Sequence, residues 1–226
     1  MISGCVGSGT SMVAGIVNIC GAFGGKLSGP TRYYQEGMYE NKEIRNFLVK
    51  KWLAGERYDT MGQRPLPDIG HCKEVAPKMA ESWLANVEII MLKHGYIHGP
   101  WFYKDAKMCL MWPIWTLAFP ESHWLIVRRN DEEIARSCLR TGFMQAYRDM
   151  RGWLWWVGEH KERFQEMAEA GLKIREVWAD KIVRGELREI KEAIDWLGLN
   201  WNEKAVIDFV APGLWGQGRY DVQLTR

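Results

Sequence analysis

The sequence predicts an α/β fold, a three-layer α/β/α arrangement with a central, mostly parallel sheet. Segments of strand character alternate with helical segments along the chain, as crossovers between parallel strands require. The run His-Trp-Leu-Ile-Val-Arg at 123–128 lacks polar alternation in its centre, which is typical of a strand buried on both faces. One core can serve a chain of 226 residues, so we expect a single domain over 1–226.

The elements are expected in the following order. Strands are expected near 1–6, 98–103, 123–128 and 174–178, and helices near 9–20, 41–53, 73–94, 113–119, 131–140, 145–170, 186–197 and 202–210. Asn41 and Asn130 are typical N-caps, and Glu133 occupies the capping-box position after Asn130. Pro77 suggests that the helix near 73–94 begins close to it, and Gly152 and Gly158 are potential breaks in the helix near 145–170.

A glycine-rich turn lies between the first strand and the first helix. Gly4, four residues, Gly9, then Thr10 and Ser11 fit the spacing of a phosphate-binding loop, although Thr10 stands where a lysine is usual. Backbone N–H groups in such a turn converge on an anion, and the following helix directs its positive end to the same point. The sequence therefore predicts an anion site at Gly7, Ser8, Gly9, Thr10 and Ser11. The alternative is a purely structural glycine turn.

Composition limits the other classes. Thirty basic against 28 acidic residues give a net charge of +2, so we expect no nucleic-acid partner. The five cysteines form no C-x-x-C pair, which argues against a zinc site or disulfide framework and fits a reducing cytoplasm. No basic residue precedes Lys26, and the first apolar stretch is interrupted by glycine and asparagine, so we expect neither a signal peptide nor a membrane partner.

A second set of polar residues follows the third strand. Arg129 comes at its end, and Ser137 lies eight residues later within the next helix. A guanidinium can bind phosphate oxygens in a fork, and a hydroxyl can add one hydrogen bond. Taken alone, the two residues are better explained as an ordinary surface arginine and an exposed helical serine.

Together, the loop Val6-Gly-Ser-Gly-Thr-Ser and the segment Arg129-Asn-Asp-Glu-Glu-Ile-Ala-Arg-Ser137 resemble the sulfotransferase family, which has a P-loop nucleotide-binding fold. Lys104-Asp-Ala-Lys107 is similar to the Lys-Asp-Pro-Arg segment of bacterial members, and Ala193–Leu199 is similar to their C-terminal helical segment. The resemblance implies that Gly7–Ser11 hold the 5′-phosphosulfate of 3′-phosphoadenosine 5′-phosphosulfate (PAPS). It implies that Arg129 and Ser137 hold the 3′-phosphate.

Two positions depart from the family pattern. Gly7 stands where the family usually has Lys or Arg. Either another cation reaches the leaving phosphate, with Lys104, Lys107 and Arg128 as candidates, or the enzyme is weak, or the chain is not a transferase. Asp131 replaces a proline, and an acidic residue suits a helix N-terminus.

The chemistry expected is in-line transfer of a sulfuryl group to a hydroxyl or amine. Phosphoryl transfer in this fold class uses a loop lysine and a metal. A sulfuryl group carries less charge, so we expect no metal. The general base is either Asp105 or His71, with the alternatives that Asp105 caps a turn or pairs with Lys107 and that His71 is an exposed loop residue.

The acceptor is expected to be a small molecule or a carbohydrate. Residues 33–34, 58–70 and 101–102 are candidates for its pocket. Two other functions stay open: a nucleotide or small-molecule kinase of related fold, and a catalytically inactive nucleotide-binding protein. The sequence does not determine the oligomeric state.

Overall fold

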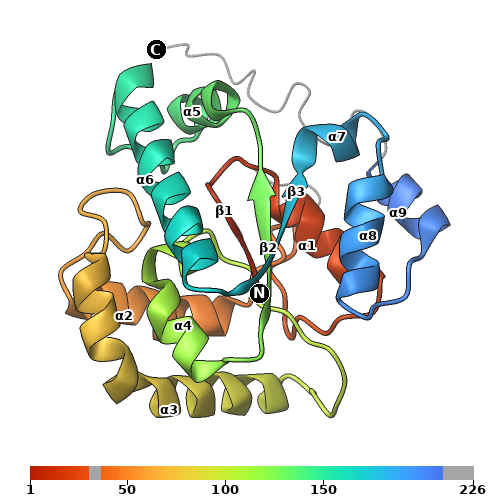
Figure 1. Ribbon diagram of the computed structural model, residues 1–226, viewed down its shortest axis with the longest axis horizontal. Helices are drawn as coiled ribbons and strands as arrows, with labels where there is room; N and C mark the ends of the chain where they lie inside the picture. Colours follow the sequence, from red (N-terminus) through yellow and green to blue (C-terminus); the bar gives the residue numbers. More distant parts are fainter. Residues whose placement is uncertain (31–36, 211–226) are drawn as a thin grey trace.

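The computed structural model describes residues 1–30 and 37–210 (Figure 1). Its sheet has three parallel strands in the order β1 (Ile2–Gly4), β2 (His123–Arg128) and β3 (Lys173–Trp178). In register, Ile2 lies opposite Leu125 and Val177 opposite Val127. The predicted α/β class and the predicted strand at 123–128 are therefore confirmed.

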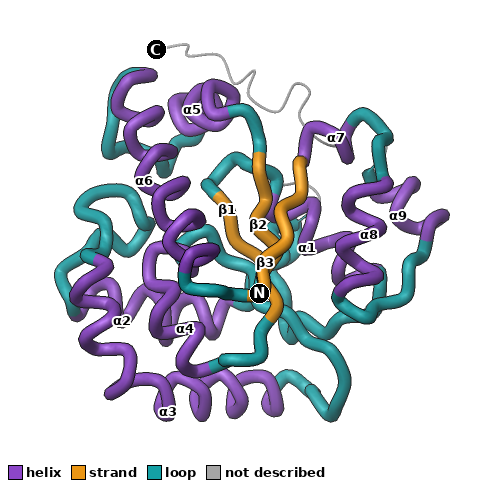
Figure 2. Tube along the Cα trace, viewed as in Figure 1, coloured by secondary structure: helices purple, strands orange, loops and turns teal. Residues whose placement is uncertain are grey.

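Helices surround this sheet (Figure 2). They are α1 (Thr10–Ile19), α2 (Lys50–Gly55), α3 (Ile69–Lys93), α4 (Trp112–Ala118), α5 (Asp131–Arg140), α6 (Met150–Glu169), α7 (Ala179–Val183), α8 (Arg188–Trp196) and α9 (Glu203–Phe209). A π-helical stretch at Ile44–Val49 precedes α2, and a 3₁₀ turn at Met108–Met111 precedes α4. Within the described ranges, no helix has both the length and the apolar character that a bilayer span needs.

The two faces of β2 pack against different helices because successive strand side chains point in opposite directions. Trp124 and Ile126 pack in a core with residues of α2, α3 and α4, whereas Leu125 and Val127 pack with residues of α1, α8 and α9. Figure 1 shows the same separation, with α2–α4 on one side of the sheet and α8 and α9 on the other. All four side chains are at most 1% exposed, as the apolar run predicts.

The strand expected near 98–103 is not a regular strand. Pro100 lacks the N–H that a strand interior would use. The chain nevertheless runs beside β1, because Ile2 N–H donates to Tyr103 O (2.9 Å) and Asp105 N–H donates to Ile2 O (3.2 Å). This pairing brings Lys104 and Asp105 to the edge of the sheet at β1.

Two helices also differ from the prediction, one in where it begins and one in its continuity. Helix α3 begins at Ile69, well before Pro77, because the carboxylate of Asp68 caps it by accepting from His71 N–H (2.7 Å). Helix α6 runs unbroken through Gly152 and Gly158, since tryptophans on one of its faces are buried in the core. The cap predicted at Asn130 is confirmed: its side chain accepts from Glu133 N–H (3.2 Å).

Candidate functional site

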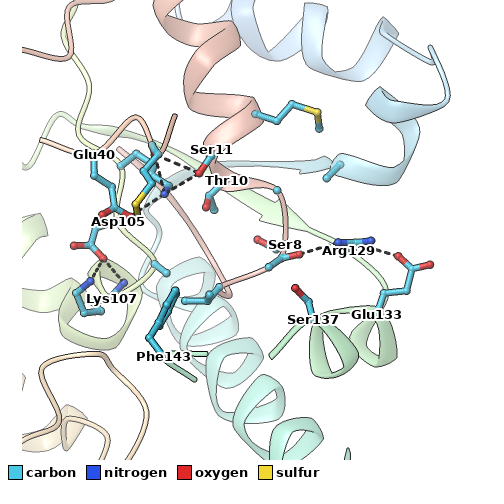
Figure 3. Close-up of a pocket in the computed structure, with 18 of the residues that line it drawn as sticks. Ser8, Thr10, Ser11, Glu40, Asp105, Lys107, Arg129, Glu133, Ser137 and Phe143 are labelled. Carbon is cyan, nitrogen blue, oxygen red and sulfur yellow. Dashed lines mark hydrogen bonds and ion pairs between the residues drawn. The ribbon is translucent and has the colours of Figure 1, made fainter. Parts of the chain in front are cut away.

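The glycine-rich turn connects the carboxyl end of β1 to the N-terminus of α1 and forms one wall of a cavity of about 600 Å³ (Figure 3). Met12 and Val13 N–H groups donate to Gly9 O, so α1 begins tightly at Gly9, whose φ is +97°. Thr10 and Ser11 provide the first N–H groups of α1, which have no carbonyl partner within a helix. These groups give the cavity an anion-binding wall.

Ser8 contributes an unused hydrogen-bonding group to this wall. Its side chain is fully buried, and its Oγ has no hydrogen-bond partner among the described residues. Buried hydroxyls normally have a partner, so Ser8 Oγ is an exception among the described residues. Gly4 permits this close packing, because a β-carbon at position 4 would lie 2.7 Å from Ser8 Oγ.

Arg129 forms the wall on one side of the loop. It follows β2, and its Nη1 donates to Gly7 O (3.1 Å) while its Nε donates to Glu133 (2.8 Å). Asp180, at the start of α7, lies 3.4 Å from the same Nε. Nε and Nη1 are thus engaged, whereas Nη2 makes no hydrogen bond with the described residues and can bind a further anion.

Ser137 lies beside the same loop. A β-carbon built on Gly7 would be 2.9 Å from Ser137 Oγ, and both residues line the cavity. The structure thus brings together the residues that the sequence grouped at Gly7–Ser11, Arg129 and Ser137 (Figure 3).

Lys104 forms the opposite side. Its Nζ lies 3.3 Å from Ser11 Oγ, 3.1 Å from Met38 O and 2.9 Å from Glu40 Oε1. Burial alone would raise the pKa of Glu40, yet the positive charges of Lys104 and Lys107 lower it from 4.5 to about 2. Glu40 is therefore ionised at neutral pH and holds Lys104 next to the loop.

Asp105 is fully buried in the cavity wall. Its Oδ1 accepts from Lys107 Nζ (2.7 Å) and Lys107 N–H (2.9 Å), and its Oδ2 accepts from the Tyr103 hydroxyl (2.9 Å). The pairing with Lys107 that the sequence left open is present. His71 lies elsewhere: it is in the first turn of α3, 2.7 Å from Glu56, and is not among the residues that line the cavity.

Sequence reasoning missed several cationic residues of this cavity. Seven basic and four acidic side chains line it; those not anticipated are Arg45, Lys50, Arg140 and Arg184 among the basic residues and Glu40, Glu133 and Asp180 among the acidic ones. No spacing in the sequence marks them, because they come from separate helices and loops. Arg128 does not line the cavity and instead pairs with Glu176 (2.9 Å).

The segments suggested for an acceptor pocket are only partly brought together. Met61 lines the cavity with Phe143, and Gln63 joins their two loops by donating to Phe143 O (2.8 Å). Trp101 and Phe102 line a different cavity, of about 500 Å³, near the amino ends of the strands. Residues 33–34 lie outside the described residues.

Neither a search for grouped metal ligands nor comparison with known proteins identifies the function of this cavity. In the part of the chain that the structure describes, no three His, Cys, Asp or Glu side chains are grouped as metal ligands. No protein-family model matches this chain, and no curated protein matches its sequence.

Proposed function

We propose that this protein has a P-loop-type nucleotide site and transfers a sulfuryl group from PAPS to a hydroxyl, or an amine, of a small-molecule or carbohydrate acceptor. One observation supports this most strongly: Arg129 and Ser137 lie against Gly7 in the cavity that the glycine-rich loop forms. Residues far apart in the sequence thereby make one anion-binding surface.

The donor set suits a nucleotide with anionic groups at both ends. In this proposal, Arg129 Nη2 and the Ser137 hydroxyl bind one phosphate, and the N–H groups of Thr10 and Ser11 with Lys104 bind the other. A cavity of about 600 Å³ is within the usual range for small-molecule sites.

Lys104 supplies the cation that position 7 lacks. Its Nζ is held beside Ser11 by Glu40 and Met38 O, so a positive charge faces the start of α1. When bound, PAPS supplies the sulfuryl group and a bisphosphate leaving group. Lys104 and the helix N-terminus then stabilise negative charge that develops on the leaving phosphate oxygen.

Asp105 is the carboxylate that we assign as the base. It is in the cavity wall, and it is kept in place by Tyr103 and Lys107. In this role it accepts the acceptor's proton as the new oxygen–sulfur bond forms. His71 does not line the cavity, so we do not assign it as the base.

Thermal unfolding with 3′-phosphoadenosine 5′-phosphate tests the proposal. At about 100 times its dissociation constant, a ligand of the folded state adds roughly 2.7 kcal/mol, which is several degrees for a chain of this size. Arg129→Ala should abolish the shift. Arg136→Ala is the matched control, since Arg136 is on α5, the helix that follows Arg129, pairs with Glu132 (2.6 Å) and does not line the cavity.

The remaining functions are distinguished by the same experiment together with a turnover assay. A shift only with ATP and magnesium would favour the kinase. The inactive nucleotide-binding protein, which the glycine at position 7 suggests, would bind the bisphosphate. It would not release bisphosphate from PAPS when acceptor mixtures are added. No shift with any nucleotide would refute the nucleotide site.

A further inference from the structure

The side of the cavity next to Asp105 has more positive than negative charge. Four cations and two carboxylates line it: Arg45, Lys50, Lys104, Lys107, Glu40 and Asp105. We call this set the lysine cluster. Glu40 pairs with both Arg45 (2.8 Å) and Lys104 (2.9 Å), and Asp105 pairs with Lys107 (2.7 Å). With every group ionised, the lysine cluster has two positive charges in excess.

Among residues 1–30 and 37–210, Lys50 is the cation of this cluster without an acidic partner. The one hydrogen bond of its Nζ within these residues is to the sulfur of Met61, at 3.3 Å, and a thioether is a weak acceptor. Its surroundings disfavour its charge: burial, followed by the positive charges of Lys107 and Arg45, lowers the pKa of Lys50. A partly buried cation in this position is expected to gain stability from an anion that enters the cavity.

Lys50 is also not one of the residues assigned to the donor. The loop, Lys104, Arg129 and Ser137 already provide for both anionic ends of the nucleotide. Within the described residues, Lys50 donates no hydrogen bond to the glycine-rich loop or to α5. Met61 and Phe143 line the cavity together with Lys50. An apolar wall beside a free ammonium suits an organic molecule with an acidic group.

We propose that Lys50 binds an anionic group of the acceptor, so that the acceptor class is a hydroxyl compound carrying a carboxylate, sulfate or phosphate. This inference rests on the proposed function, because only sulfuryl transfer makes the bound compound an acceptor. The anion site at Lys50 itself does not depend on it and can be tested separately.

The experiment is a titration with inorganic sulfate, followed by NMR, of protein saturated with 3′-phosphoadenosine 5′-phosphate. Lys50→Met removes the charge and keeps the length of the side chain. Lys51→Met is the matched control, because Lys51 is exposed on the same helix and does not line the cavity. We expect Lys50→Met to weaken sulfate binding about tenfold, the size of a hydrogen bond to a charged group, and Lys51→Met to leave it unchanged.

Bisphosphate affinity should be the same in both variants. Sulfate binding that is insensitive to Lys50→Met would overturn the proposal, as would a loss of bisphosphate affinity in that variant, since Lys50 would then belong to the donor site. If the bisphosphate does not bind to the unaltered protein, the proposed function fails. The sulfate titration without nucleotide then still decides whether Lys50 forms an anion site.

Discussion

A β-carbon at position 7 would lie 2.9 Å from Ser137 Oγ, and Gly7 itself has a φ of +87°. The loop and α5 are therefore packed so closely that no side chain fits between them. This contact gives a physical reason for the glycine at position 7, and it excludes simple replacement of that glycine by a cationic residue.

Gly7→Ala should destabilise the protein and weaken bisphosphate binding. Positive φ costs a non-glycine residue about 1–2 kcal/mol, and overpacking against Ser137 adds roughly 1–3 kcal/mol. Gly21→Ala is the control, since Gly21 has a φ of +105° but open space around its β-carbon position. Denaturant unfolding of the two variants measures the difference. Equal losses would show that the Gly7–Ser137 contact is unimportant.

Lys104→Met should reduce turnover about a hundredfold, the usual effect of removing one group that stabilises transition-state charge. Glu40 keeps its bond to Arg45 in this variant, so the fold should persist. Release of bisphosphate from PAPS, in the presence of an acceptor found by screening, is the measurement. Lys42→Met, at an exposed position outside the cavity lining, should have full activity. Normal turnover without Lys104 would remove its assigned role.

Asp105→Asn should lower turnover by about 10²–10⁴ if Asp105 is the base. The substitution also leaves Lys107 without its carboxylate, so the double variant Asp105→Asn with Lys107→Met is needed to restore neutrality. Both variants should stay slow while binding the bisphosphate. Recovery of turnover in the double variant would mean that Asp105 serves only to neutralise Lys107.

Acid should destabilise the protein through His160. Its side chain is buried in α6, where Nδ1 donates to Trp156 O (2.9 Å), and burial lowers the pKa of His160 from 6.5 to about 4. The unfolded chain therefore binds the extra proton first, and stability falls as the pH drops from 6.5 towards 4. The loss should be about 2 kcal/mol between pH 6.5 and about pH 5.

Denaturant unfolding at several pH values measures this slope. His160→Gln should remove the contribution of His160, whereas His98→Gln, at an exposed site, should leave it. The Glu40 contribution is lost in a lower window, as the pH falls from 4.5 towards 2, and does not overlap. An unchanged slope in His160→Gln would contradict the assignment.

Local signals in the sequence were sufficient for much of the fold. The apolar run at 123–128, the Asn130 cap with Glu133, and the glycine turn before α1 each depend on residues close together in the chain, so they could be predicted. The error at Pro77 was also local, because the capping residue Asp68 lies nine residues before Pro77 and starts the helix earlier than the proline suggests.

The sequence by itself determined the α/β class and the residues of the loop, because periodicity and turn chemistry act over a few residues. Only the tertiary structure decided that Lys104 reaches Ser11, that Ser137 leaves room for glycine alone at position 7, and that Lys50 has no acidic partner within the described part of the chain. These relationships arise where β1 pairs with the chain near Lys104 and where α5 packs on the loop. Contacts of this kind join residues far apart in sequence, and no local pattern encodes them.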